Sequence, residues 1–181
     1  MSGASLFVIG GARSGKSRYA QARAEAAGSA PVFIATAEAF DDEMRERIAR
    51  HQADRDARWS TVEAPRDLPA AIDALNGGDA VVLVDCLTLW VSNLLLADAD
   101  IPRAGEQLCD AIARFDGTLI FVANEVGLGI VPDNTLARRF RDAAGLLNQA
   151  VAAAVEEVVL LTAGLPLTLK SGCEDQSTSR M

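Results

Sequence analysis

The chain has 181 residues, of which half are hydrophobic and 23% are charged, and its formal net charge is −8. This length and composition predict one folded domain over residues 1–170, followed by a polar tail over residues 171–181. The negative charge argues against nucleic acid or an anionic membrane as a partner, because both attract basic surfaces. A small-molecule substrate is expected.

No apolar run approaches the roughly 18 residues of a transmembrane helix, and the first residues do not read as a signal peptide. We therefore expect a cytoplasmic protein with no membrane insertion. The three cysteines have neither paired spacing nor histidines around them. They suggest neither a disulfide framework nor a zinc site.

Short apolar runs alternate with helical patterns, which is typical of an α/β fold with a mainly parallel sheet covered by helices on both faces. The runs VVLV and LIFV lack polar alternation, so they should be central strands. Pro102 fits the first turn of its helix. Strands are predicted at residues 6–9, 32–35, 60–62, 80–84, 118–123, 158–162 and 167–169, and helices at residues 16–27, 41–57, 67–75, 87–97, 102–115 and 134–156.

Apolar side chains nearly encircle the helix predicted at residues 87–97 (sequence CLTLWVSNLLLA from residue 86). One sheet is not expected to cover all of that surface. An exposed remainder would be an interface with another subunit.

The pattern Gly-x4-Gly-Lys-Ser occupies residues 10–17, directly after the apolar run LFVI and at the start of a helix. Glycines let the backbone curl so that its N–H groups face phosphate oxygens, and the helix N-terminus adds partial positive charge. We expect Lys16 to contact the outer phosphates and the Ser17 hydroxyl to ligate Mg²⁺. The alternative is a glycine-rich turn that binds nothing.

Asp85 ends the apolar run AVVLV, at the position of a Walker B carboxylate. The end of such a strand lies near the phosphate loop in doubly wound sheets, where a carboxylate can hold Mg²⁺ directly or through water. Alternatively, Asp85 caps the helix that starts at Leu87, since aspartate is a favoured N-cap.

His51 is the only histidine, and it lies on the apolar stripe of the helix predicted at residues 41–57. Arg47, Arg50 and Arg55 surround it, so a polyphosphate at His51 would meet several guanidinium groups. Nearby arginines also lower the pKa of an imidazole and keep it neutral and nucleophilic. The alternative is a partly buried structural histidine beside a solvated arginine face.

Asn124 and Glu125 follow the run LIFVA, at another strand end where such sheets bind ligands. Gly127 and Gly129 come next and suggest a tight backbone near the substrate or at a subunit boundary. The alternative is an ordinary mobile loop.

Over about residues 6–170 the chain resembles the bifunctional adenosylcobinamide kinase/adenosylcobinamide-phosphate guanylyltransferases of cobalamin biosynthesis. The motifs that carry this resemblance are GGARSGKSRYA from residue 10, IATAEAFDDEM from residue 34, RIARHQADR from residue 47, WSTVEAP from residue 59, DCLTLWVSNLL from residue 85, NEVGLGIVPDN from residue 124 and RRFRDAAGLLNQ from residue 138.

The resemblance implies a homotrimer of RecA-like P-loop NTPase domains with two activities. First, ATP or GTP phosphorylates the amino-propanol hydroxyl of adenosylcobinamide. Then GMP passes from GTP to His51, with release of pyrophosphate, and from His51 to the substrate phosphate to give adenosylcobinamide-GDP.

The same resemblance implies the site residues. Lys16 and His51 are catalytic, and Ser17 and Asp85 hold the metal, although many family members have Glu where this chain has Asp85. The nucleotide contacts are Gly10, Gly11, Ala12, Arg13, Ser14, Gly15, Lys16, Ser17, Thr36, Ala37, Glu38, Gln52, Ala53, Asp54, Arg55, Glu63 and Asp85.

Two other functions remain open at this point. A simple P-loop kinase would phosphorylate its substrate without a covalent intermediate, and His51 would be structural. A non-catalytic binding module would sense nucleotide with residues 10–17 and respond through the loop at residues 124–134.

Overall fold

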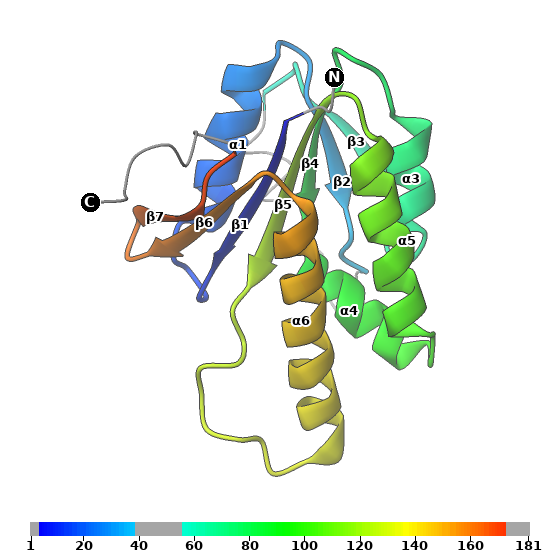
Figure 1. The fold of residues 1–181 in the computed structure, drawn as a ribbon, viewed down its shortest axis with the longest axis vertical. Helices are drawn as coiled ribbons and strands as arrows, with labels where there is room; N and C mark the ends of the chain where they lie inside the picture. Colours follow the sequence, from blue (N-terminus) through cyan, green and yellow to red (C-terminus); the bar gives the residue numbers. More distant parts are fainter. Residues whose placement is uncertain (1–3, 39–55, 173–181) are drawn as a thin grey trace, which may run out of the picture.

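The structure is a computed structural model that describes residues 4–38 and 56–172. Seven strands form one sheet in the order β3-β2-β4-β5-β1-β6-β7 (Figure 1). All neighbours pair in parallel except β6 and β7, which are antiparallel. The strands are β1 (Ser5–Gly10), β2 (Val32–Ala35), β3 (Ser60–Glu63), β4 (Val81–Asp85), β5 (Thr118–Asn124), β6 (Glu157–Thr162) and β7 (Leu165–Lys170).

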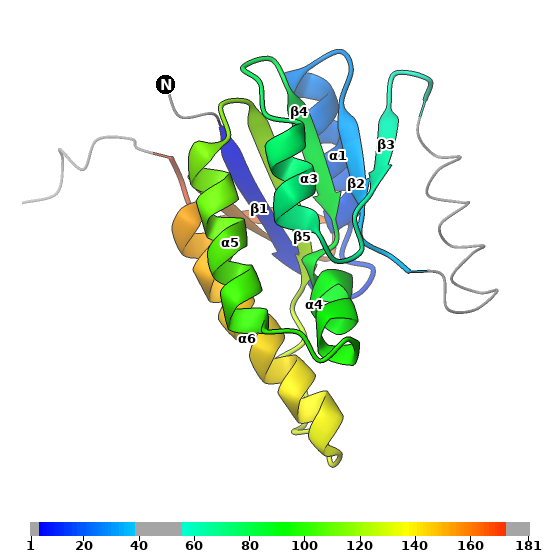
Figure 2. The same cartoon turned by 90° about the vertical axis from the view of Figure 1, so that its right-hand side faces the viewer.

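Helices cover both faces of the sheet, as the alternating pattern predicted. One face packs against α1 (Lys16–Ala27), and the other packs against α3 (Leu68–Ala74), α5 (Ile101–Arg114) and α6 (Thr135–Ala154) (Figure 2). Helix α4 (Leu87–Leu96) directly follows β4 and lies at the end of the sheet where that strand stops.

The two strands predicted to be central are central. Strand β4 lies between β2 and β5, and β5 lies between β4 and β1. Their side chains alternate between the two hydrophobic clusters: Val84 and Phe121 face α3, α5 and α6, whereas Leu83 and Val122 face α1. Burial on both faces explains why neither strand carries alternating polar residues.

Predicted helix ends differ from the structure where side chains cap the helices. Asp100 accepts a hydrogen bond from the Arg103 amide, so α5 begins at Ile101 with Pro102 in its first turn. Asn134 likewise accepts from the Ala137 amide and precedes α6 instead of belonging to it. The helix predicted at residues 41–57 lies almost wholly outside the described residues, and its predicted last residues, 56–57, are not helical.

Helix α4 is covered more completely than its sequence predicted. Leu87, Trp90 and Val91 are buried in the cluster that includes α5 and α6, because those two helices as well as the sheet contact α4. The exposed apolar remainder is mainly Leu96, at 61%. Large exposed apolar side chains lie instead in the loop after β5, on α6 and on β7, namely Leu128, Ile130, Val131, Leu136, Leu146, Leu165, Leu167 and Leu169.

Within residues 4–38 and 56–172, the structure contains no helix that is both long enough and apolar enough to cross a membrane.

Candidate active site

The loop between β1 and α1 has the context that the Gly-x4-Gly-Lys-Ser pattern requires. β1 ends at Gly10 and α1 begins at Lys16. Gly15 precedes the helix with φ of +95°, a left-handed backbone conformation that favours glycine. The first turn of α1 contains no acidic residue. No acidic side chain there competes for the partial positive charge of the helix N-terminus, which favours an anion.

Two polar side chains in this loop fit a phosphate ligand. The Lys16 ammonium is nearly buried and donates a hydrogen bond to the Gly11 carbonyl oxygen at 3.0 Å. The Ser14 hydroxyl is buried and, among the described residues, has no hydrogen-bond partner. Buried hydroxyls are nearly always paired, so this one points to a ligand of the loop.

The loop is supported by the neighbouring strands. The Gly164 amide, in the turn between β6 and β7, donates to the Ser14 carbonyl oxygen at 2.9 Å. Gly10 pairs with Asn124 on one side and with Leu161 on the other. A β carbon at Gly10 would lie 2.5 Å from the Leu161 carbonyl oxygen, so the close approach of β6 requires glycine there.

Asp85 ends β4, at the same edge of the sheet as the phosphate loop. Strand β5 lies between β4 and β1, so Asp85 is separated from Gly10 by one strand. The N-cap of α4 is Cys86, which makes no side-chain capping bond. The alternative in which Asp85 is the N-cap of that helix is therefore wrong.

The Cys86 thiol is not a candidate nucleophile. Burial, together with the nearby Asp85 carboxylate, raises its pKa to about 11. The thiol therefore stays protonated at neutral pH, and only the thiolate is strongly nucleophilic.

Residues 36–38 follow β2, and Glu63 ends β3. Thr36 is fully buried: its hydroxyl donates to the Cys86 carbonyl oxygen and accepts from the Cys86 amide, both at 2.8 Å. Its side chain thus ties the end of β2 to the end of β4. Glu38 pairs with Arg66 at 3.2 Å, and both line a hollow of about 570 Å³ together with Glu63.

Five of the predicted site residues lie outside the described part of the chain. They are His51, Gln52, Ala53, Asp54 and Arg55. The structure places the remaining predicted residues at one edge of the sheet, in the phosphate loop and after β2, β3 and β4.

The loop after β5 starts at the phosphate loop itself. The Glu125 amide donates to the Gly10 carbonyl oxygen at 3.0 Å, and the Asn124 amide donates to the Thr88 hydroxyl at 2.7 Å. Beyond this point the side chains of Leu128 and Ile130 are at least 90% exposed. Among the described residues, a β carbon at Gly129 would meet nothing within 4 Å, whereas one at Gly127 would lie 3.0 Å from a Glu125 carboxylate oxygen.

Sequence reasoning missed the polar side chains of α4 that support these loops. Thr88 holds the start of the loop after β5, and Asn93 is buried at 3% exposure beneath residues 36–38. A hydroxyl and an amide in an otherwise apolar helix were the available signal, because a buried polar group needs partners.

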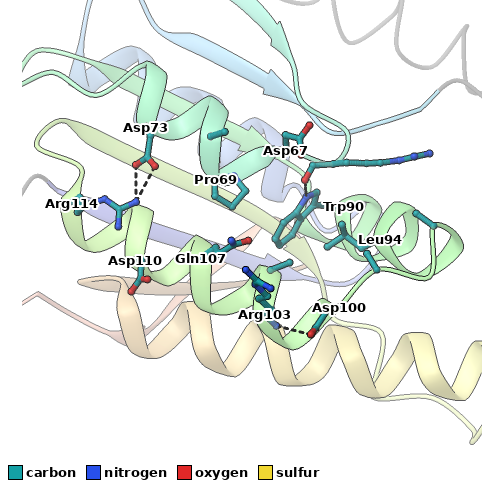
Figure 3. A pocket seen from close by; sticks show the side chains of 15 residues that line it. Asp67, Pro69, Asp73, Trp90, Leu94, Asp100, Arg103, Gln107, Asp110 and Arg114 are labelled. Carbon is teal, nitrogen blue, oxygen red and sulfur yellow. Dashed lines mark hydrogen bonds and ion pairs between the residues drawn. The ribbon is translucent and has the colours of Figure 1, made fainter.

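A larger hollow of about 820 Å³ lies between α3, α4 and α5 (Figure 3). Two pairs of polar groups around it bind each other: Arg114 pairs with Asp73, and the Trp90 indole N–H donates to the Arg66 carbonyl oxygen. This hollow lies on the face of the sheet covered by α3, α5 and α6, and no residue of the phosphate loop lines it. We do not assign it to the active site.

Two solved structures share the fold. A Pyrococcus horikoshii OT3 protein has a TM-score of 0.53 over 94% of this chain and 87% of its own, at 10% identity. The flagellar accessory protein FlaH of Methanocaldococcus jannaschii has a TM-score of 0.53 over 94% of this chain and 80% of its own, also at 10% identity. With the phosphate loop after β1, the fold is that of a RecA-like P-loop NTPase, as expected.

Curated relatives are much more similar in sequence. The bifunctional adenosylcobalamin biosynthesis protein CobP of Pseudomonas aeruginosa is 47% identical over 166 residues, which cover 91% of this chain and 96% of the relative. The corresponding CobU proteins of Salmonella typhimurium and Escherichia coli are 42% and 41% identical, over 91% of this chain and 99% of each relative. The model of the cobinamide kinase/cobinamide phosphate guanyltransferase family matches residues 6–169, and the chain belongs to that family.

Proposed function

We propose that this enzyme carries out the two reactions of its family. It phosphorylates adenosylcobinamide from ATP or GTP, and it then joins GMP from GTP to the new phosphate, giving adenosylcobinamide-GDP. The observation that carries this proposal is the phosphate loop, with its nearly buried Lys16 side chain and a buried Ser14 hydroxyl that has no hydrogen-bond partner among residues 4–38 and 56–172.

In the kinase step the chain mainly positions the reactants and balances charge. Lys16 and the N–H groups of the loop offset negative charge on the outer phosphates while the substrate hydroxyl attacks the terminal phosphorus. The Ser17 hydroxyl and the Asp85 carboxylate are oxygen donors of the kind that Mg²⁺ prefers. When bound there, Mg²⁺ would neutralise phosphate charge.

The described residues contain no group of three or more His, Cys, Asp or Glu side chains arranged to hold a metal ion. A magnesium ion held by Ser17 and Asp85 would therefore rely on phosphate oxygens and water for its other ligands. This behaviour is typical of Mg²⁺, which usually keeps several waters and binds through few protein groups.

In the guanylyl-transfer step His51 acts as the nucleophile. Its ring nitrogen attacks the α-phosphorus of GTP, a P–N bond forms, and the bond to the bridging oxygen breaks as pyrophosphate leaves. An oxygen of the substrate phosphate then attacks the same phosphorus, and the P–N bond breaks to restore the imidazole. In a direct displacement the substrate phosphate and the α-phosphate of GTP, both anions, would repel each other. A neutral imidazole nucleophile avoids that repulsion.

The nucleotide contacts proposed for this step are residues 36–38, residues 52–55 and Glu63. The two carboxylates, Glu38 and Glu63, border the same hollow. Carboxylates next to a nucleotide are suited to accept hydrogen bonds from base or ribose groups, which are donors. The phosphates belong to the loop at residues 10–17.

We also propose a homotrimer as the working form. Support comes from family resemblance and from the exposed apolar side chains of the loop after β5 and of β7, such as Ile130 and Leu165. Large exposed apolar side chains of this kind are candidates for contacts between subunits.

Two variants test the phosphate loop, and a third separates the two steps. Lys16→Ala should abolish both activities, whereas Arg18→Ala, which removes an exposed cation from the same helix, should abolish neither. His51→Asn should retain kinase activity and lose guanylyl transfer. Full transfer by His51→Asn would make the histidine structural, and loss of both activities in a folded protein would place it in a shared nucleotide site instead.

A further inference from the structure

Asn93 is a buried amide that bridges two loops at the edge of the sheet. Its Nδ2 donates to the Thr36 carbonyl oxygen at 2.7 Å and to the Pro65 carbonyl oxygen at 2.9 Å. The first carbonyl belongs to residues 36–38 and the second to residues 63–66. We call these two segments the edge loops. One side chain of α4 therefore fixes both edge loops at once.

Three other contacts join the edge loops to α4 or to each other. From one turn earlier on α4, the Trp90 indole N–H donates to the Arg66 carbonyl oxygen at 2.8 Å (Figure 3). Arg66 in turn pairs with Glu38 across the two edge loops, at 3.2 Å. The Ala64 amide donates to the Ala35 carbonyl oxygen at 2.9 Å, so the backbones are also joined directly.

Glu38 and Glu63 border the hollow of about 570 Å³. The side chains that hold their loops in place, Asn93 and Trp90, do not line that hollow. Asn93 is only 3% exposed, and Trp90 is fully buried. Both hydrogens on Asn93 Nδ2 are used on backbone carbonyls, and no water can replace them at such burial. The amide is therefore suited to hold position and does not contact substrate.

Thr88 provides a contrast on the same helix. It is buried at 8% exposure, and its hydroxyl accepts from the Asn124 amide, which begins the loop beside the phosphate loop. Strands β4 and β5 separate β2 from β1, so the edge loops and the phosphate loop are two strands apart. Helix α4 thus supports two parts of the site with different side chains.

We propose that Asn93 is a positioning residue for guanylyl transfer, acting by fixing Glu38 and Glu63 relative to each other. The proposal rests on the proposed function, in which those two carboxylates contact GTP. Loss of the amide donors frees the edge loops while the phosphate loop keeps its own support. Binding of GTP for transfer should suffer more than phosphorylation.

The test uses Asn93→Asp, which keeps the shape but replaces the donors with an acceptor, and Asn93→Leu, which removes them without adding charge. Asn76→Leu is the matched control, because the Asn76 amide also donates to a backbone carbonyl, that of Arg114, but lies at the edge of the sheet where β4 and β5 begin, opposite the phosphate loop. We measure the KM for GTP and kcat in guanylyl transfer, the kinase rate with ATP, and the Tm of each full-length protein.

Both Asn93 variants should raise the KM for GTP in transfer at least tenfold while changing the kinase kcat/KM less than threefold. Asn76→Leu should leave that KM within twofold. If either folded Asn93 variant keeps the KM of the unmodified enzyme, or if both activities fall together as for a general loss of stability, the proposal is overturned. Neither outcome depends on whether His51 carries GMP. The steady-state rate of guanylyl transfer can be measured whether or not the reaction has a covalent intermediate.

Discussion

Replacing Gly10 with alanine should destabilise the protein, whereas the same replacement at Gly11 should not. A β carbon at Gly10 would lie 2.5 Å from the Leu161 carbonyl oxygen and 2.7 Å from the Ser14 hydroxyl. The backbone oxygen belongs to a paired strand and cannot rotate away. At the exposed Gly11, a β carbon would meet nothing within 4 Å.

The magnitude follows from overpacking. Forcing an extra carbon into a packed site costs about 1–3 kcal/mol. For a chain of this size each kcal/mol lowers the Tm by roughly 2–4 °C, so Gly10→Ala should lower it by roughly 2–12 °C. Gly11→Ala should stay within about 0.5 kcal/mol of the unmodified protein, as exposed substitutions usually do.

Thermal unfolding followed by circular dichroism, with the two variants measured side by side, decides the matter. Nucleotide affinity should fall with stability in Gly10→Ala, because relief of the clash moves either β6 or the Ser14 side of the loop. Equal Tm values for the two variants would refute the packing of β1 against β6 described above.

Three further changes test other parts of the account. The Arg23 guanidinium holds the pKa of the Glu157 carboxyl below its usual value, so Glu157→Gln should lower the free energy of unfolding by up to about 1 kcal/mol at pH 7. That difference should be complete above about pH 5, since the pairing needs the carboxylate, and should disappear as the pH falls through the lowered pKa; a pH-independent difference would speak against the ion pair. In a protein whose other two cysteines are serine, Cys86 should resist alkylation by iodoacetamide at pH 8 and react once denatured, and rapid reaction in the native state would show that its burial is misjudged. Asp85→Asn should raise the Mg²⁺ concentration needed for half-maximal kinase activity, and an unchanged titration would remove Asp85 from the metal site.

The sequence predicted the elements whose cause is local. The runs VVLV and LIFV lack polar residues because both faces of β4 and β5 are covered. The apolar pattern of each run was therefore enough to predict a central strand. The phosphate loop could also be predicted from the sequence, because its glycines and Lys16 act within a few residues of one another.

Features that depend on distant partners could not be predicted in this way. Asn93 reaches carbonyl groups 57 and 28 residues earlier in the chain, and no local pattern states where those carbonyls lie. Likewise, the insertion of β5 between β1 and β4 is a property of the sheet order, and it separates Asp85 from Gly10.

The apolar surface of α4 was misread for a related reason. Its leucines suggested an exposed interface, but Leu87 and Leu94 lie in the buried cluster that α4 shares with α5 and α6, which only the packing of three helices reveals. Exposed apolar residues occur instead at sites such as Leu128 and Leu167, in a loop and on an edge strand.

The central claim is that one chain both phosphorylates its substrate and carries GMP on His51. Incubation with Mg²⁺ and GTP labelled at the α-phosphate should leave one labelled GMP on the protein, with pyrophosphate released. Mass spectrometry of the digested protein should place the adduct on the peptide that contains His51. The P–N bond should break in acid and survive in alkali, because protonated imidazole is a good leaving group. Absence of label from a protein that still makes adenosylcobinamide-GDP, or label that persists in His51→Asn, would contradict the account.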